Sequence, residues 1–492
     1  MRTVWVFGDQ LNRRIGALGA ADPRDTRVLL VESEALLRPG QHIQRLHLVV
    51  AAMRRFAAEL AEEGFVVDRR RSPTLTAGLR AHVDEHAPDA VVATEPNARA
   101  ARALCDRLGV AQVRSDQFLC HPDDFRGWAQ GRSTLRMEDF YRWQRKRLGY
   151  LMDGDAPAGG RWNFDRDNRE PPPRDPSIFS RPPATPLDEL DKDVLASLPA
   201  TPGEPPIGLW ATDRGQALAR LDHFLDHELS RFGRYEDAMT QGSWSLAHSM
   251  LSPYLNLGLL LPAEVCDAVE ARYRAGEVPI NSAEGFIRQV IGWREYVWNL
   301  YWLWPELADA NELGHQRPLP PAFTGEATTR MRCLADVLEG LERRAWVHHI
   351  PRLMVLSSFA NLYGVAPRLV MHWMLDRYID AAEWVMVPNV MGMGLWADGG
   401  RMASKPYISG GAYIDRMSDY CAGCPYDPRR RAGEDACPFT TLYWDFLARH
   451  EERLAGNHRL ARPLASMRRL SDLEEVRARA ADVIAGIGEG RV

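Results

Sequence analysis

The chain has 492 residues, of which 45% are hydrophobic and 26% are charged, and its formal net charge is −5 at pH 7. This length predicts two or three domains with sizeable cores, and this composition is typical of a globular protein. The negative charge argues against a globally basic, histone-like binder, but it allows a local basic patch that binds nucleic acid.

The sequence holds no apolar run of about 18 residues, so we expect no membrane-spanning segment. Its start shows no charged region followed by a long apolar run, which predicts no secretion signal. Seven cysteines without a secretory context favour a reducing cytoplasm and metal ligation over disulfides. We expect Cys105, Cys120 and Cys266 to be core residues, because they lie in helical or apolar stretches.

Short apolar runs alternate with helical patterns at the start of the chain. The runs at 3–7, 27–31, 65–67, 89–93 and 110–113 predict buried strands, and 41–63, 75–87 and 97–108 predict helices. This alternation predicts a doubly wound parallel sheet, whose ligands bind beyond the carboxyl ends of the strands. The polar groups expected there are Gly8, Asp9, Gln10 and Glu32, although each taken singly could be a plain loop residue. A GxGxxG dinucleotide fingerprint is absent.

Proline divides the chain. Twelve prolines fall between Pro157 and Pro206, which predicts an extended linker rather than a helix. Within it, the aromatic and acidic segment 159–165 is expected to dock onto a domain. From Ala211 onwards the pattern is helical. We therefore predict an α/β domain at 1–130, a linker at 131–210 and an all-α domain at 211–492.

Two segments of the helical part could bind a ligand, and an aromatic helix lies between them in the chain. The segment 249–256 places two serine hydroxyls ahead of a helix opened by Pro253, which suits a pyrophosphate, although a plain serine cap is commoner. The aromatic stripe of the helix near 284–304 is typical of a core. The glycine-rich stretch 388–399 predicts a loop that lets a planar ligand approach the backbone.

Two adjacent histidines, His348 and His349, precede an apolar helix. Neighbouring positions of a helix point to different sides, so one imidazole can face a cavity while the other packs. A lone histidine is usually structural, and the pair is therefore a candidate site only together with its neighbours.

The cysteines of the segment 421–438 have the spacing of metal ligands. Cys421 and Cys424 are separated by Ala-Gly, and Cys437 follows after twelve residues and precedes a proline. Three thiols at this spacing predict a soft metal centre. No histidine lies in the segment, and we favour Cys333 over His450 as the fourth ligand. The spacing leaves structural zinc and an iron–sulfur cluster both open, and the Cys-Pro pair leans towards the cluster.

Taken together, these motifs resemble the bacterial iron–sulfur branch of the photolyase/cryptochrome family, whose characterised enzymes repair (6-4) photoproducts in DNA. The resemblance runs almost end to end, through 7–11, 159–165, 249–258, 286–296, 348–354, 380–392 and the four cysteines. It implies an α/β antenna domain, a long linker and an all-helical FAD domain. It implies a [4Fe–4S] cluster on Cys333, Cys421, Cys424 and Cys437. It also implies a 6,7-dimethyl-8-ribityllumazine antenna near Gly8, Asp9, Gln10 and Glu32.

The resemblance also implies the residues of the reaction. The implied FAD contacts are Tyr235, His248, Ser249, Leu251, Ser252, Gln289, Arg294, Arg352, Asp380, Met386 and Asn389. Asp237, His349 and Tyr407 would face a lesion that is flipped out of UV-damaged DNA. Light absorbed by the lumazine would excite reduced FAD, which donates an electron to the lesion while imidazolium His349 supplies a proton. The electron then returns, so no net redox change results.

Three positions depart from the family pattern. Met386 stands where a polar side chain usually faces flavin N5, and a thioether cannot hydrogen-bond an N–H group there as a carboxylate would. In the electron-transfer route Trp373 is present, but Met374 and Phe323 replace oxidisable aromatics. Possible substitutes are Trp346, Trp384 and Trp396.

The main hypothesis is thus a light-driven (6-4) DNA photolyase, a lyase that acts as a cytoplasmic monomer. The first alternative is a cryptochrome-type photoreceptor that uses flavin redox change for signalling. A metal-stabilised nucleic-acid-binding module without photochemistry is the third reading, and it predicts a colourless protein.

Overall fold

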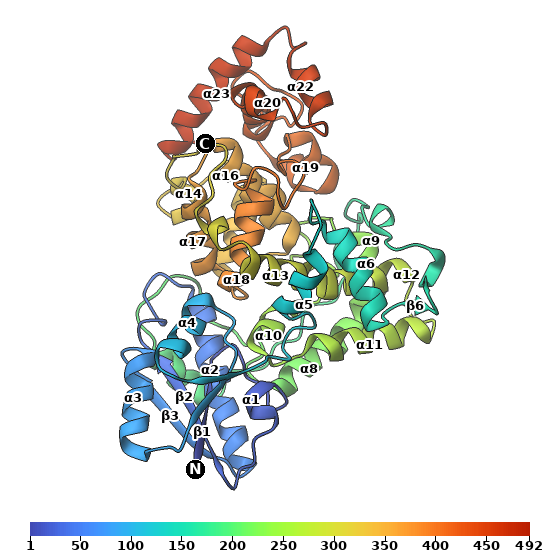
Figure 1. Cartoon of the computed structure of the whole chain (residues 1–492). Helices are drawn as coiled ribbons and strands as arrows, with labels where there is room; N and C mark the ends of the chain where they lie inside the picture. Colours follow the sequence, from blue (N-terminus) through green and yellow to red (C-terminus); the bar gives the residue numbers. More distant parts are fainter.

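The computed structural model describes residues 1–492, with a sheet domain at one end and helices at the other (Figure 1). The sheet is parallel, in the order β3-β2-β1-β4-β5. Its strands are β1 (Arg2–Val6), β2 (Thr26–Ser33), β3 (Val66–Ser72), β4 (Val91–Thr94) and β5 (Ala111–Val113). In the central register, Val4 lies opposite Val28 on one side and Val92 on the other. The predicted strands are confirmed.

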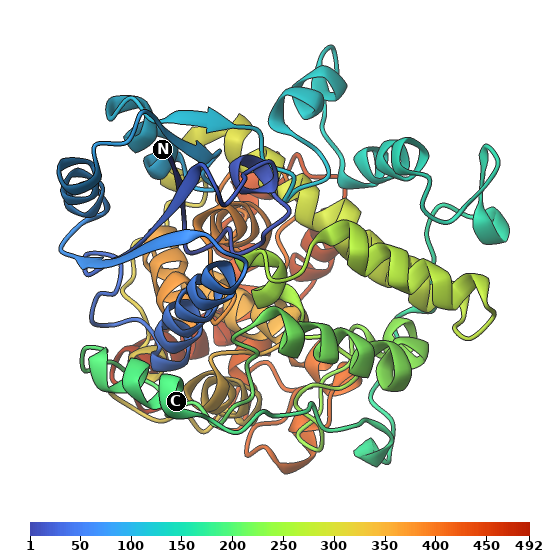
Figure 2. The same cartoon turned by 90° about the horizontal axis from the view of Figure 1, so that it is seen from below.

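Helices cover both faces of this sheet (Figure 2). They are α1 (Gly16–Gly19), α2 (Ile43–Glu62), α3 (Leu75–His86) and α4 (Arg99–Arg107). The next helix, α5 (Pro122–Ala129), packs instead against the helical part of the chain. Alternate residues of a strand point to opposite faces. Accordingly, Val4 packs in one core with Leu48 of α2, and Trp5 packs in another with Leu79 of α3 and Cys105 of α4. The predicted doubly wound sheet is therefore confirmed.

The segment 131–210 is more structured than the predicted linker. It holds α6 (Met137–Leu148), a hairpin of β6 (Met152–Asp153) and β7 (Ala156–Pro157), single turns η1 (Ala158–Gly160), η2 (Asp165–Asp167) and η3 (Pro176–Ile178), and α7 (Glu189–Ser197). The prediction of a helix-free stretch up to Pro206 is wrong at α7. Asp188 and Asp191 form a capping box there, in a stretch without proline. The predicted docking of 159–165 is confirmed, since Phe164 is buried and its N–H donates to Glu284 Oε2 at 2.9 Å.

The rest of the chain is helical, as predicted. Its first part contains α8 (Arg214–His223), η4 (Phe224–Glu228), α9 (Leu229–Tyr235), α10 (Ser252–Leu257), α11 (Pro262–Arg274), α12 (Ile280–Ile287), η5 (Arg288–Arg294), α13 (Glu295–Leu303), η6 (Pro305–Asp309), α14 (Pro321–Thr324) and α15 (Arg332–Arg344). Its second part contains η7 (Pro351–Ser357), α16 (Ser358–Tyr363), α17 (Pro367–Arg377), α18 (Glu383–Met386), η8 (Val387–Gly394), α19 (Gly411–Met417), η9 (Tyr420–Gly423), α20 (Pro438–Arg449), α21 (Glu451–Leu454), α22 (Ala461–Met467) and α23 (Leu473–Gly488).

Four of these segments, η4, η5, η7 and η8, are π-helical turns within or beside α-helices. The predicted aromatic helix forms from α12, η5 and α13, and it ends before Pro305. The loop predicted after Pro388 is wrong, because 387–394 continues α18 as a π-helix. Its glycines permit close packing: a Cβ added at Gly392 would lie 2.8 Å from Met402 Sδ, and one at Gly394 would lie 2.8 Å from Ser357 Oγ.

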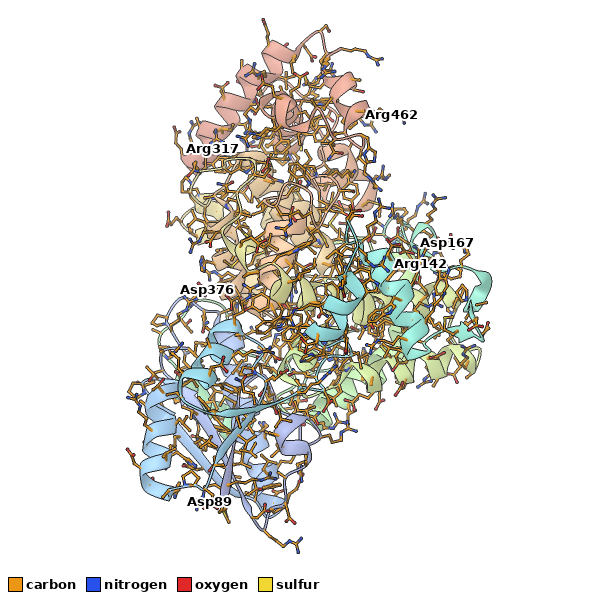
Figure 3. All side chains as sticks on the ribbon, in the orientation of Figure 1. Asp89, Arg142, Asp167, Arg317, Asp376 and Arg462 are labelled. Carbon is orange, nitrogen blue, oxygen red and sulfur yellow. The ribbon has the colours of Figure 1, made fainter.

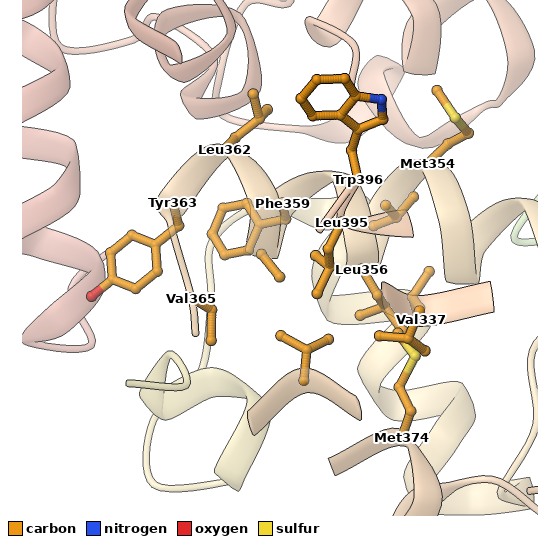
Figure 4. Close-up of a cluster of buried hydrophobic side chains, with 14 of the residues drawn as sticks. Val337, Met354, Leu356, Phe359, Leu362, Tyr363, Val365, Met374, Leu395 and Trp396 are labelled. Atoms are coloured by element: carbon orange, nitrogen blue, oxygen red, sulfur yellow. The ribbon is translucent and has the colours of Figure 1, made fainter. Parts of the chain in front are cut away.

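Aliphatic and aromatic side chains fill the core of the helical part, where Val337, Leu356 and Met374 lie together (Figure 4). Charged side chains such as Arg142 and Arg462 lie at the outer surface (Figure 3). None of the helices combines the length and the apolar character that a membrane crossing requires.

Candidate functional site

A cavity of about 230 Å³ lies between α10, the η5–α13 helix and the α18–η8 helix. The predicted flavin contacts that line it are Ser249, Leu251, Ser252, Gln289, Arg294, Asp380 and Asn389. Trp293 and Trp384 add two aromatic walls that the sequence analysis did not assign to a flavin site. Apolar walls with a few convergent polar groups are typical of a cofactor site.

Asp380 on the cavity wall is held by several hydrogen bonds. Arg352 donates to it from both terminal nitrogens, at 2.9 and 3.0 Å, in a bidentate ion pair. Ser252 Oγ donates to Asp380 Oδ2 at 2.6 Å, and Asn256 donates to the Asp380 carbonyl at 2.9 Å. The Arg352 guanidinium also lies over the Tyr378 ring, 4.1 Å from its centroid. The ion pair is therefore formed and oriented by the protein itself.

Four predicted flavin contacts lie outside this lining: Tyr235, His248, Arg352 and Met386. Tyr235 packs its ring edge-on against Phe179 with centroids 5.5 Å apart. Met386 ends α18 and is 3% exposed, so its thioether lies in the protein interior.

Three imidazoles cluster next to the cavity. His248 and His348 are stacked with ring centroids 4.2 Å apart, and burial lowers the pKa of each well below its ordinary value. His349 lies edge-on to His248, with a side chain that is 47% exposed. Its Nε2 is 3.5 Å from Asp237 Oδ1. His349 is thus the exposed imidazole of the cluster, and a carboxylate lies beside it.

A second carboxylate, Glu236, joins this cluster to the cavity. Burial raises its pKa to about 7, and Gln289 of the cavity wall donates to its Oε1 at 2.5 Å. Burial likewise raises the pKa of the Tyr407 phenol, and the Asp237 charge contributes to that rise. The structure thus brings Asp237 and His349 together. The sequence analysis did not assign Glu236, although its position beside Asp237 was a signal for it.

The four predicted metal-ligating cysteines line one small apolar pocket. Cys333 lies on α15, Cys421 on η9, Cys424 directly after it, and Cys437 directly before α20. None forms a disulfide. Burial raises the pKa of Cys333 well above its usual value, and the other three sulfurs raise it further.

This donor set fits a soft metal group. Four thiolates in an apolar pocket repel one another, and a bound cation or cluster offsets that repulsion. Gly411 lets the backbone pass close to the Cys437 sulfur, because a Cβ added at this glycine would lie only 2.9 Å from Cys437 Sγ. His450 is not part of the pocket lining and instead faces His315, with the Nε2 atoms 3.3 Å apart.

Beyond the carboxyl end of the central strand β1, Asp9 and Gln10 face the segment that follows β4. Asn97 donates to Asp9 Oδ2 at 3.1 Å, and Gln10 donates to the Glu95 carbonyl at 2.8 Å. Burial raises the pKa of Asp9 to about 6. The side-chain carbonyl oxygens of Gln10 and Asn97 are buried without a hydrogen-bond donor. Unpaired buried acceptors are costly, so they fit a bound molecule that donates to them.

Gly8 and Glu32 have different surroundings from Asp9. A Cβ added at Gly8 would lie 2.9 Å from Met53 Sδ, so the backbone there packs closely on α2. Glu32 accepts hydrogen bonds from Arg54 at 2.9 Å and from Arg69 at 2.8 Å. Its carboxylate is therefore engaged by arginines of α2 and β3.

Comparisons with known proteins show which family this chain is similar to. The family model described as "Deoxyribodipyrimidine photo-lyase-related protein" matches residues 4–206. A curated "(6-4) photolyase" of Agrobacterium fabrum is 42% identical over 498 residues, which cover 97% of this chain and 98% of that protein.

The chain belongs to the bacterial (6-4) photolyase family. Solved structures share its fold. A bacterial class III photolyase from Agrobacterium tumefaciens matches with a TM-score of 0.60 at 17% identity, covering 99% of this chain and 98% of the other. A cryptochrome from Synechocystis matches with a TM-score of 0.53 at 14% identity, covering 80% and 83% of the two chains.

In this photolyase family member, the surroundings of Trp373 contain few oxidisable side chains. Its Nε1 donates to the Phe323 carbonyl at 2.8 Å, and its ring lies 4.7 Å from the Phe323 ring. Met374 is buried among aliphatic side chains (Figure 4). Two of the three departures noted in the sequence, Met374 and Phe323, are therefore neighbours of Trp373, the first in the chain and the second in space.

A second cavity was not anticipated from the sequence of this family member. It measures about 1350 Å³ and lies between the segments 126–138, 399–404 and 458–459. Its charged lining is mainly basic, with Arg126, Arg132, Arg136, Arg401, Arg459 and His458 against Glu138. Trp293 lines both this cavity and the smaller one. This basic cavity therefore adjoins the smaller one at Trp293.

Proposed function

We propose that this protein repairs (6-4) photoproducts in DNA under blue light, with FAD bound at the cavity between α10, the η5–α13 helix and the α18–η8 helix, and with His349 as proton donor. The observation that carries the proposal is the position of His349. It is an exposed imidazole 3.5 Å from a carboxylate, beside two buried histidines and next to the cavity. Similarity over 97% of the chain to a protein named "(6-4) photolyase" supports the same function.

The cavity residues would hold the flavin in a defined orientation. FAD, when bound, supplies a light-driven electron that no protein side chain supplies. The hydroxyls of Ser249 and Ser252 suit its pyrophosphate, and the Arg352–Asp380 pair suits the polar edge of the isoalloxazine ring. Because the pair is already formed, little order would have to be created on binding.

His349 would act on the damaged base. A flipped photoproduct at this place would meet an imidazole, which can act as a general acid and donate a proton to the group that must return to its original base. Asp237 Oδ1, which lies 3.5 Å from His349 Nε2, would hold the imidazole in place. Tyr407 would contact the lesion from another side. His349 would thus supply the proton, Asp237 would position its imidazole, and Tyr407 would limit the space around the base.

Two further groups are part of the proposal. The four cysteines would bind a [4Fe–4S] cluster, which ties α15, η9 and α20 together. Asp9 and Gln10 would contact 6,7-dimethyl-8-ribityllumazine, and the unpaired acceptor oxygens of Gln10 and Asn97 support a ligand with N–H or O–H donors. Gly8 and Glu32 would line or support that site.

The basic cavity would receive the DNA backbone beside the lesion. Its arginines match phosphate geometry, and it adjoins the smaller cavity at Trp293, where the strand that flanks a flipped base would pass. We further propose that the protein acts as a monomer in the cytoplasm, where free cysteines are compatible with a reducing environment.

The deciding test is repair of an oligonucleotide with a single (6-4) lesion by chemically reduced, flavin-loaded protein under blue light. An oligonucleotide with a cyclobutane dimer serves as the control substrate. Repair of the (6-4) substrate alone is expected. If neither lesion is repaired although flavin is bound, the photoreceptor alternative is the better explanation.

A further inference from the structure

An array of aromatic rings extends from the flavin cavity towards the sheet domain. Trp384 lines the cavity, and its ring lies 5.7 Å from that of Trp298 in an edge-to-face pair. Trp298 lies 5.4 Å from Trp302, and Trp302 lies 5.2 Å from Tyr301. Phe118 fills the space beside the first pair, stacked on Trp298 at 3.9 Å. Each step of the array is a direct ring contact.

The burial of these rings changes along the array. Trp384 and Trp298 are 2% and 3% exposed, whereas Trp302 is partly exposed. The array therefore connects a buried cavity with solvent through three tryptophans, which are among the most easily oxidised side chains. Trp373, by contrast, has a phenylalanine as its nearest ring, and phenylalanine does not relay an electron hole readily.

Charged side chains at the outer end of the aromatic array determine which ring can stably carry the positive charge that electron loss leaves behind. The Arg102 guanidinium lies 4.0 Å above the Trp302 ring and disfavours a positive charge on that ring. Arg99 lies 3.8 Å above Tyr301 in the same way. Tyr301, however, donates its hydroxyl to Glu383 Oε2 at 2.8 Å. Oxidation of Tyr301 can therefore release its proton to Glu383 and leave an uncharged radical that the nearby arginines do not destabilise.

We propose that Trp384, Trp298 and Trp302 form the route by which electrons reach the flavin, with Tyr301 as the terminal donor. This inference rests on flavin binding in the cavity, as proposed above. In the first step Trp384 loses one electron to the light-excited oxidised flavin. Trp298 then reduces Trp384, Trp302 reduces Trp298, and Tyr301 reduces Trp302 while its phenolic proton moves to Glu383.

A soluble thiol completes the balance. It releases its proton to solvent and gives one electron through the partly exposed Trp302 to the Tyr301 radical, Glu383 returns the proton to Tyr301, and two of the resulting thiyl radicals combine to a disulfide. The net change per electron is one thiol oxidised and the flavin reduced by one electron. This arrangement replaces a route through Trp373, which Met374 and Phe323 interrupt.

The test compares Trp298→Phe with Trp128→Phe in the full-length, flavin-loaded protein. Trp128 is also buried, but it belongs to a separate aromatic cluster. The measurement is the initial rate at which oxidised-flavin absorbance disappears under blue light with excess thiol, and the flavin content of each variant is determined after denaturation. Trp298→Phe is expected to lower the rate by roughly tenfold or more, and Trp128→Phe to retain the wild-type rate.

Transient absorption adds a second readout. Tyr301→Phe is expected to remove the neutral tyrosyl signal and to shorten the lifetime of the separated charges. If Trp298→Phe binds no flavin, the partly exposed Trp302→Phe takes its place. A wild-type photoreduction rate in these variants, or a loss confined to Trp373→Phe, overturns the proposal. None of these measurements uses DNA, so a failure of repair and a failure of the route are separate results.

Discussion

Replacing Arg136 and Arg459 with alanine tests whether the basic cavity binds the DNA backbone. Both side chains are exposed, line the cavity and have no carboxylate partner within ion-pair distance. Arg401 is a poorer choice, because it already pairs with Glu306 at 2.7 Å. A guanidinium without a partner can bind a phosphate without first giving up another interaction.

The expected magnitude follows from counterion release. Each phosphate contact contributes about 0.9 to the slope of log K against log salt concentration for B-DNA. Loss of both arginines should therefore lower that slope by about 1.8, and should weaken binding to damaged and undamaged duplexes alike. The flavin content should stay at the wild-type level, since neither side chain lines the smaller cavity.

Fluorescence anisotropy with a labelled duplex, titrated between about 50 and 200 mM salt, measures this slope. The matched control is a double alanine variant of Arg80 and Arg107, which are exposed arginines of α3 and α4 in the sheet domain. The control should keep the wild-type slope. An unchanged slope in the cavity variant, or an equal decrease in the control, would refute the assignment of this cavity to DNA.

Three further predictions concern single residues. His349→Ala should lower the rate of (6-4) repair by the chemically reduced enzyme by about 10²–10⁴, and full repair activity would contradict the role of His349 as proton donor. Cys421→Ser should lose iron and soluble yield together, because cluster binding is coupled to folding, whereas unchanged iron content would place the ligand elsewhere. Burial raises the pKa of Asp9 from 3.8 to about 6, so the folded state binds this proton more tightly than the unfolded state. The free energy of unfolding should therefore fall by about 2 kcal/mol as pH rises from about 4 to 6, and urea titrations should find this decrease missing in Asp9→Asn.

The sheet domain could be predicted from the sequence because its signals are local. Val4 and Trp5 alternate between two cores, and each apolar run is short enough to be a strand rather than a helix. The prediction failed at α7, where proline content concealed the capping box of Asp188. It also failed after Pro388, where glycines that permit close packing were taken as signs of a loop.

The candidate site was predicted less evenly. Cys333 lies far from the other cysteines in the chain, yet the structure places all four sulfurs in one pocket, as expected. The basic cavity escaped prediction because its arginines come from three separate segments, none of which is a basic run. Trp298 escaped because its place in an aromatic helix is that of an ordinary core residue. Such assemblies depend on distances between segments that no local pattern encodes.

The π-helical turns η5, η7 and η8 make the flavin cavity unusually sensitive to the length of the chain. These turns carry Gln289 and Arg294, Arg352, and Asn389, respectively. A π-turn holds one residue more than the α-helix around it, and deletion of that residue restores the α-helix. Each following side chain would then rotate by about 100° around the helix axis. A single-codon deletion in η5 would turn Trp298 away from Trp384, although it would leave the helix intact and every core residue chemically unchanged. At these three turns, the number of residues is therefore under as strong a constraint as their identity.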